Sequence, residues 1–96
     1  MGRIVCKLKV PDDVAKLVQG MHPELKRKTK ASLDAILDDP GSGKALKNEL
    51  DGLRSFRVGT FRTIYRVTRR IVEIVAIGPR KRIYEETYRL LKRETR

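Results

Sequence analysis

The stretch from Ser55 to Ile77 constrains the fold more than any other part of the chain. Within it, apolar and polar residues alternate in three successive segments, as they do in strands that bury one face. These segments are Ser55 to Val58, Phe61 to Thr68 and Ile71 to Ile77. Only Gly59-Thr60 and Arg69-Arg70 separate them, and a connection of two residues is typical of a β-hairpin. The sequence therefore predicts an antiparallel meander of three strands.

The residues before the meander predict one strand and two helices. Alternating apolar residues indicate a strand that Pro11 ends, and its inward side chains are Ile4, Cys6, Leu8 and Val10. The first helix follows Asp12 and has its apolar residues at the spacing of one helical face, namely Val14, Leu17, Val18 and Met21. Pro23 suits the first turn of a second helix, which ends before Asp39. Together the two helices form a hairpin with a basic outer face.

The rest of the chain completes a single α+β domain over residues 1–96. Gly41 to Gly52 mixes turn residues with two leucines and predicts a loop with room for one helical turn. After Pro79, a thin apolar stripe of Ile83, Thr87, Leu90 and Leu91 predicts a last helix, marginal by itself. The predicted order is β-α-α-β-β-β-α. It indicates an antiparallel sheet with the helical hairpin packed on one face.

The charge of the chain narrows the classes of partner. Lys and Arg number 23 against 12 Asp and Glu, a net charge of +11. Such an excess suits RNA, DNA, an anionic membrane or an acidic protein, although a generally basic, solvated surface has the same composition. No apolar run approaches the roughly 20 residues that cross a bilayer, and the N-terminus lacks a signal-peptide block, so we expect a cytoplasmic protein. One Cys and one His leave no basis for a zinc site; we expect neither metal nor cofactor.

The two turns of the meander determine which side chains share a face. Arg57 opposes Arg62 across the first turn, and across the second Arg66 opposes Glu73 while Arg62 opposes Ile77. One face is then an apolar surface for the two helices to cover, made of Phe56, Val58, Phe61, Tyr65, Val67, Val72, Ile74 and Ala76. The opposite face carries Arg57, Arg62 and Arg66 among Ile64, Val75 and Ile77.

Arg57 and Arg62 have no carboxylate predicted beside them. Like charges opposite each other destabilise a sheet by roughly 0.2–1 kcal/mol, so the pair suggests an anion fork, because guanidinium groups bind phosphate bidentately. The alternative is that both stems lie over apolar neighbours with their charged heads in water. Three more cations, Arg80, Lys81 and Arg82, follow at the edge of this face, and they favour the anion hypothesis.

Three blocks of the sequence resemble the RelE/ParE toxin superfamily. They are Leu50-Asp51-Gly52-Leu53, Arg57-Val58-Gly59-Thr60-Phe61-Arg62-Thr63-Ile64-Tyr65, and Ile77-Gly78-Pro79-Arg80 followed by Tyr84. The resemblance implies a microbial RNase-like fold and the toxin half of a type II toxin–antitoxin pair, for which the charge predicts an acidic antitoxin. RelE-type members cut mRNA in the ribosomal A site, whereas ParE-type members poison DNA gyrase. The short helical hairpin and the basic C-terminal segment resemble the RelE type.

The resemblance also implies roles for particular residues. Arg62 and Arg80 would stabilise charge on the phosphoryl oxygens, and Tyr84 would stack on the substrate nucleotide or, alternatively, anchor the last helix by an apolar contact. Further substrate contacts would come from Arg57, Lys81, Arg82 and Lys47. Gly59 stands where RelE has its second lysine, so the proton acceptor is unassigned, with Lys81 or Lys47 as substitutes.

Three hypotheses about function follow. The chain is a ribosome-dependent mRNA endonuclease that leaves 2′,3′-cyclic phosphate ends, a non-enzymatic inhibitor of gyrase, or a decayed toxin that only binds RNA. The arginines and Tyr84 favour the first hypothesis, and the missing lysine favours the other two.

Overall fold

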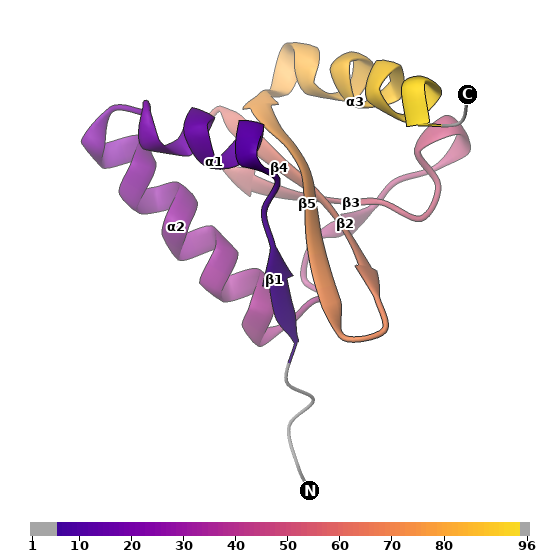
Figure 1. Cartoon of the computed structure of the whole chain (residues 1–96), viewed down its shortest axis with the longest axis horizontal. Helices are drawn as coiled ribbons and strands as arrows, with labels where there is room; N and C mark the ends of the chain where they lie inside the picture. Colours follow the sequence, from indigo (N-terminus) through magenta and orange to yellow (C-terminus); the bar gives the residue numbers. More distant parts are fainter. Residues whose placement is uncertain (1–5, 95–96) are drawn as a thin grey trace, which may run out of the picture.

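The structure is a computed structural model that describes residues 6–94. A twisted sheet lies between the pair α1 and α2 on one side and α3 on the other (Figure 1). The elements in chain order are β1 (Lys7–Lys9), α1 (Asp12–Gln19), α2 (Pro23–Asp38), β2 (Lys44–Ala45), the 3-10 helix η1 (Asn48–Leu50), β3 (Arg54–Val58), β4 (Phe61–Thr68), β5 (Ile71–Pro79) and α3 (Arg80–Glu94). The predicted α+β class is confirmed.

The sheet has five strands in the order β1-β5-β4-β3-β2 and is mostly antiparallel. It departs from the prediction at both edges. β1 pairs with β5 in the parallel sense, because the helical hairpin carries the chain away before the meander begins. The short strand β2 lies within the segment that the sequence predicted as a loop. The part of the predicted first strand before Cys6 lies outside the described residues.

The register of the meander agrees with the prediction up to a bulge in β5. Arg57 pairs with Arg62 on β4, and Arg66 pairs with Glu73. However, Arg62 lies opposite Gly78 instead of Ile77, since the pairing shifts by one residue between Ile64 and Tyr65. One extra residue on β5, Val75, therefore reverses the faces of the residues that follow it.

Two apolar cores result, one on each face of the sheet. The first lies under α1 and α2 and includes Val14, Val18, Leu33, Ile36, Tyr65, Val72, Ile74 and Ile77. The second lies under α3 and includes Leu53, Ile64, Ala76 and Ile83. The bulge corrects two assignments, because Ile77 packs with the helical hairpin and Ala76 packs with α3, the reverse of what strict alternation predicts. Ile83 and Thr87 of the predicted stripe are fully buried, so α3 covers part of the face expected to carry only arginines among apolar neighbours.

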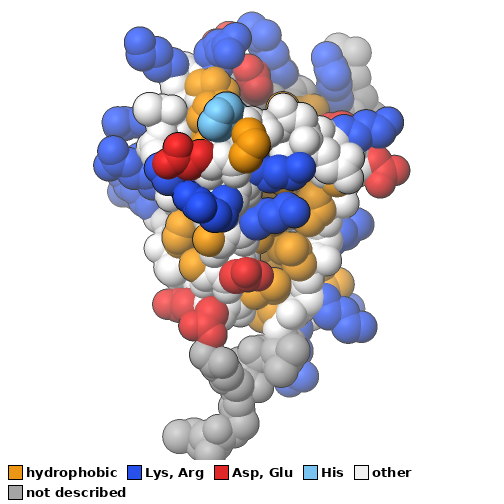
Figure 2. All heavy atoms as spheres, turned by 90° about the vertical axis from the view of Figure 1, so that its left-hand side faces the viewer, with side chains coloured by type: hydrophobic (Ala, Val, Ile, Leu, Met, Phe, Trp, Pro, Cys, Tyr) orange, Lys and Arg blue, Asp and Glu red, His pale blue; other side chains and the backbone are white. Residues whose placement is uncertain are grey.

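The first half of α2 carries a cluster of cations on the outer side of the helical hairpin. Figure 2 shows Lys and Arg side chains around apolar patches on this side of the molecule. The exposed cations of α2 include Arg27, Lys28 and Lys30, and Glu24 makes an ion pair of 3.9 Å with Lys28. The cluster agrees with the predicted basic stretch Lys26 to Lys30, although α1 and α2 together carry five acidic residues against five Lys and Arg.

A buried tyrosine connects the sheet to the loop after α2. Tyr65 on β4 is completely buried, and its hydroxyl donates to the carbonyl oxygen of Pro40 at 2.8 Å. The same hydroxyl accepts a hydrogen bond from the backbone N–H of Gly43 at 2.9 Å. The loop that leads into β2 is thus held against the sheet by one side chain.

Glu73 joins three strands through its carboxylate. Arg66 Nε donates to Glu73 Oε1 at 2.6 Å, and Lys9 Nζ lies 3.8 Å from Glu73 Oε2. The hydrogen bond from Arg66 is the largest cause that lowers the pKa of Glu73 below its usual value of 4.5, and the charges of Arg66 and Lys9 act in the same direction.

We expect Glu73→Gln to lower stability at neutral pH and to have little effect in acid. Because the pKa of Glu73 is lower in the folded than in the unfolded protein, its stabilisation is present above the unfolded value and is lost as the pH falls below it. Urea unfolding at about pH 7 should show a loss of about 1 kcal/mol, which shrinks and then disappears as the pH is lowered through the folded-state pKa of Glu73. Lys9→Gln is the control, with a smaller effect because that side chain is 68% exposed. A loss that does not change with pH would contradict the prediction.

Candidate functional site

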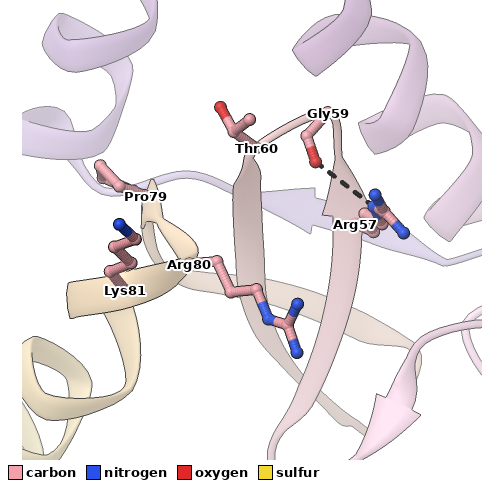
Figure 3. A pocket seen from close by; sticks show the side chains of 6 residues that line it. All are labelled: Arg57, Gly59, Thr60, Pro79, Arg80 and Lys81. Atoms are coloured by element: carbon pink, nitrogen blue, oxygen red, sulfur yellow. Dashed lines mark hydrogen bonds between the residues drawn. The ribbon is translucent and has the colours of Figure 1, made fainter.

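An open pocket of about 300 Å³ lies where the β3–β4 turn meets the junction of β5 and α3. It is lined by Arg57, Gly59, Thr60, Pro79, Arg80 and Lys81 (Figure 3). The backbone N–H of Arg80 donates to the carbonyl oxygen of Thr60 at 3.0 Å and holds the two segments together. The pocket therefore combines residues from the two ends of the meander.

Local geometry explains why cations converge here. Gly59 has a φ of +60°, which suits a two-residue hairpin turn, so β3 and β4 reverse within two residues. β5 ends at Pro79 and α3 begins at Arg80 without a linker. Arg80 and Lys81 therefore lie in the first turn of a helix that has no acidic residue there, and the positive end of the helix dipole adds to the positive potential.

The charges around the pocket lack acidic partners. Arg57 Nε makes a long hydrogen bond of 3.4 Å to the carbonyl oxygen of Gly59, and Arg62 lies directly across from Arg57 on β4. Within residues 6–94, neither Arg57, Arg62 nor Arg80 makes an ion pair. Arg66, farther along β4, contrasts with them because it pairs with Glu73. The cations near the pocket are thus available to an anion.

Arg62 is half-buried and lies beside the pocket without lining it. It shares a sheet face with Arg57, its cross-strand partner, and lies opposite Gly78, just before the Pro79 wall of the pocket. The structure therefore places Arg57, Arg62, Arg80 and Lys81 close to one another.

Tyr84 belongs to the second turn of α3 and is half-buried against the second core. Its hydroxyl is 3.2 Å from Ser55 Oγ, where either group can donate. Ser55 is only 2% exposed and precedes Arg57 by two residues on the same strand face. Ser55 is not among the site residues that the sequence predicted. The alternation of β3 was a usable signal, because it places Ser55 on the same face as Arg57.

The two remaining predicted contacts lie away from the pocket. Arg82 is exposed on α3 and does not line it. Lys47 precedes η1, in the loop beside the C-terminal part of α3, whereas the pocket is at the start of that helix (Figure 1). Fifteen residues of helix span roughly 20 Å, so Lys47 lies at the opposite end.

The lining residues can bind an oxyanion but include no histidine or carboxylate. His22 is elsewhere, at the start of α2, where its Nδ1 accepts a hydrogen bond from the backbone N–H of Glu24 at 3.3 Å. The described part of the chain contains no cluster of acidic, Cys or His side chains that could hold a metal ion. Among residues 6–94 there is also no helix with the length and apolarity needed to span a membrane.

Residues 8–84 match the sequence model of a family described as the ParE toxin of the type II toxin–antitoxin system parDE. None of the curated proteins matches the chain.

Several solved structures share the fold. The RelBE2 toxin–antitoxin complex from Mycobacterium tuberculosis is 23% identical, with a TM-score of 0.68, over 78% of this chain and 98% of that one. The archaeal RelE–RelB complex from Pyrococcus horikoshii is 24% identical, with a TM-score of 0.67, over 81% and 98%. A mutant of the E. coli toxin RelE in the free state is 17% identical, with a TM-score of 0.69, over 88% and 90%. These similarities establish the fold.

Proposed function

Since this chain belongs to the ParE toxin family of type II toxin–antitoxin systems, within the RelE/ParE superfamily, we propose that it inhibits translation by cutting mRNA on the ribosome. The observation that carries this proposal is the group of cations without acidic partners at the β3–β4 turn and the start of α3. Such a group suits a phosphodiester that gains negative charge during cleavage.

In the proposed reaction, the ribose 2′-oxygen attacks the adjacent phosphorus. A bond from O2′ to phosphorus forms, the bond from phosphorus to O5′ breaks, and a 2′,3′-cyclic phosphate and a 5′-hydroxyl remain. Arg62 and Arg80 stabilise the charge that develops on the phosphoryl oxygens, because a guanidinium remains protonated and cannot act as a base near neutral pH. Arg57 adds a third positive group at the same face.

The attacking 2′-hydroxyl must give its proton to an acceptor, and O5′ must receive a proton as it leaves. Gly59 occupies the position at which RelE has a lysine, so this chain requires another group. Lys81 lines the pocket beside Arg80, whereas Lys47 lies at the other end of α3. Location therefore favours Lys81 over Lys47 for proton transfer or phosphate contact.

We propose that Ser55 positions Tyr84, and expect Ser55→Ala and Tyr84→Phe to lower activity by similar amounts. Each change removes one partner of the 3.2 Å contact, whose loss corresponds to about 1 kcal/mol, or about fivefold in rate. Single-turnover cleavage rates would be measured for both variants and for their combination. The double variant should be no slower than either single variant, because both remove the same interaction. Ser42→Ala, at an exposed serine, is the control. Independent, multiplying effects would contradict this role.

Inhibition of DNA gyrase is the second candidate function. It is favoured by the match to a ParE family model and by the absence of a lysine at Gly59. The two functions are separated by adding the purified toxin to an in vitro translation reaction, with mapping of mRNA ends, and to a gyrase supercoiling assay in parallel. We expect ribosome-dependent cuts and unaffected supercoiling. Intact mRNA together with inhibited supercoiling would overturn the proposal.

We further propose that an acidic antitoxin neutralises this toxin. RelB and YefM accompany their toxins in several of the similar structures. Here a groove of about 360 Å³ between α2 and β3 is lined by Lys28, Ala31, Ser32, Ala35, Phe56, Arg57, Val58 and Gly59. Because β2 pairs with β3 only at Arg54 and Ser55, the rest of that edge can accept a strand from a partner. Co-purification with the product of the adjacent gene tests this; a basic or non-binding product would contradict it.

A further inference from the structure

The turn between β4 and β5 is built from two arginines in a conformation that side chains disfavour. Arg69 has a φ of 48° and Arg70 a φ of 68°. Since Thr68 pairs with Ile71, these are the only two loop residues, and positive φ at both defines a type I′ turn. Such turns strongly prefer Asn-Gly, because a Cβ is strained at positive φ. The stability of the turn therefore does not explain why both positions are arginine.

The surrounding sheet holds this turn in place. β4 pairs with β5 up to Thr68 and Ile71, and β1 pairs with the other side of β5 from Ile71 onwards. The backbone N–H of Lys7 donates to the carbonyl oxygen of Arg70 at 2.8 Å. Strain that persists in such a well-determined segment is a recognised mark of function.

More cations share the sheet face next to the turn. Lys7 pairs with Ile71, and Lys9 and Arg66 both pair with Glu73. Five cations therefore gather at this end of the sheet (Lys7, Lys9, Arg66, Arg69 and Arg70), with Glu73 as the acidic residue among them. In the described part of the chain, Lys7, Arg69 and Arg70 make no ion pair.

This end of the sheet is separate from the candidate pocket. Figure 1 shows the β4–β5 turn projecting away from α3 and from the start of α1. β4 runs from Phe61, next to the pocket turn, to Thr68, next to this turn, and its eight residues span roughly 23 Å. A single nucleotide in the pocket does not reach so far, whereas a folded polynucleotide does.

We propose that the Arg69-Arg70 turn, together with Lys7, is a second binding site for the phosphate backbone of a nucleic acid. Arginine is suited to this because its planar fork binds phosphate oxygens in pairs. Two adjacent arginines at the tip of a narrow hairpin can reach into a groove or along a strand that a broader surface does not enter. The site positions the protein on a structured RNA or a DNA duplex, and it does not depend on cleavage in the pocket.

Replacement of the turn by Asn-Gly tests this proposal, because it acts on stability and binding in opposite directions. Arg69→Asn with Arg70→Gly relieves the strained φ values, so the thermal unfolding midpoint should rise. The same variant loses two phosphate contacts, so binding to a labelled stem–loop RNA or to duplex DNA should weaken about tenfold near 0.1 M salt. The slope of log K against log salt should fall by about 2.

Two further variants serve as controls. Arg69→Lys with Arg70→Lys retains both charges and should retain the salt slope. Lys16→Gln with Lys44→Gln removes the same net charge from exposed positions elsewhere and should weaken binding much less. A loss with RNA alone or with DNA alone supports the site and identifies its ligand. Unchanged binding by the Asn-Gly variant overturns the proposal. So does a loss of binding in the Lys16 and Lys44 variant that equals the loss in the Asn-Gly variant. The proposal also fails if the Asn-Gly variant loses as much affinity for polyglutamate, a polyanion without phosphate, as it loses for nucleic acid.

Because this test measures binding, it is independent of the proposed cleavage. In a protein that carries Arg80→Ala, the Asn-Gly replacement should lower the salt slope by the same amount as in the unmodified protein. The second site can therefore be detected in a protein without nuclease activity. Conversely, the Asn-Gly variant should cut mRNA normally when RNA is saturating, since its pocket is intact. A cleavage defect that persists at saturating RNA would place the turn in the catalytic machinery and would contradict a purely positioning site.

Discussion

Arg62→Ala and Arg80→Ala are each expected to abolish growth inhibition by this toxin. Arg80 lines the pocket and Arg62 lies beside it, and neither has an acidic partner in the described structure. Loss of one group that stabilises developing charge lowers a rate by about 10²–10³-fold. The measurements are growth after induction and the rate of mRNA cleavage in an in vitro translation reaction.

The same variants should fold normally. Arg80 is exposed and Arg62 is half-buried, so truncation opens no cavity in either core, and stability should change by about 0.5 kcal/mol or less. Arg89→Ala is the matched control, because Arg89 is an exposed arginine of α3 whose ion pair with Glu85 is on the surface. If both variants remain as toxic as the Arg89 control, the pocket is not the site of action.

Gly43→Ala is expected to be the most destabilising of the small substitutions considered for this chain. A Cβ at Gly43 would lie 2.4 Å from the hydroxyl oxygen of Tyr65 and less than 3 Å from two atoms of its ring. Tyr65 is completely buried within the first core and cannot move aside. We expect a loss of about 3 kcal/mol, from overpacking together with the hydrogen bond of Gly43 to Tyr65.

Tyr65→Phe provides the complementary test. It leaves the backbone N–H of Gly43 and the carbonyl oxygen of Pro40 without their partner, which costs about 1–3 kcal/mol. Combined with Gly43→Ala it should be less destabilising than the sum of the two, since the closest clashing atom is gone. Urea unfolding measures all three variants. Gly20→Ala, where a Cβ meets only ordinary contacts of 3.6 Å or more, is the control; equal stability of the two alanine variants would contradict this account of the loop.

Much of the fold follows from local sequence patterns. The strands of the meander, both of its turns and the pairing of Arg57 with Arg62 and of Arg66 with Glu73 are predicted from alternation and loop length. The two helices of the hairpin and the buried residues Ile83 and Thr87 of α3 are predicted from helical spacing. These features depend on contacts between residues close in the sequence, for which the pattern contains the necessary information.

The site residues divide in the same way. The sequence brings Arg57 and Arg62 together because one tight turn joins their strands, and it places Arg80 and Lys81 beside that face because they directly follow the third strand. Only the tertiary structure distinguishes the two candidate lysines: Lys81 lines the pocket, whereas Lys47 lies at the far end of α3. Only the folded chain brings Ser55 to Tyr84, since 29 residues separate them.

By itself, the sequence determined the element types, the α+β class, the register near each turn and the basic character of one sheet face. The tertiary structure decided the parallel pairing of β1 with β5, the short strand β2, the bulge at Val75 and the face covered by α3. Each of these depends on which distant apolar surfaces can be buried together. The bulge illustrates the reason: one extra residue sends Ala76 to one core and Ile77 to the other, and only packing against both layers of helices selects it over strict alternation.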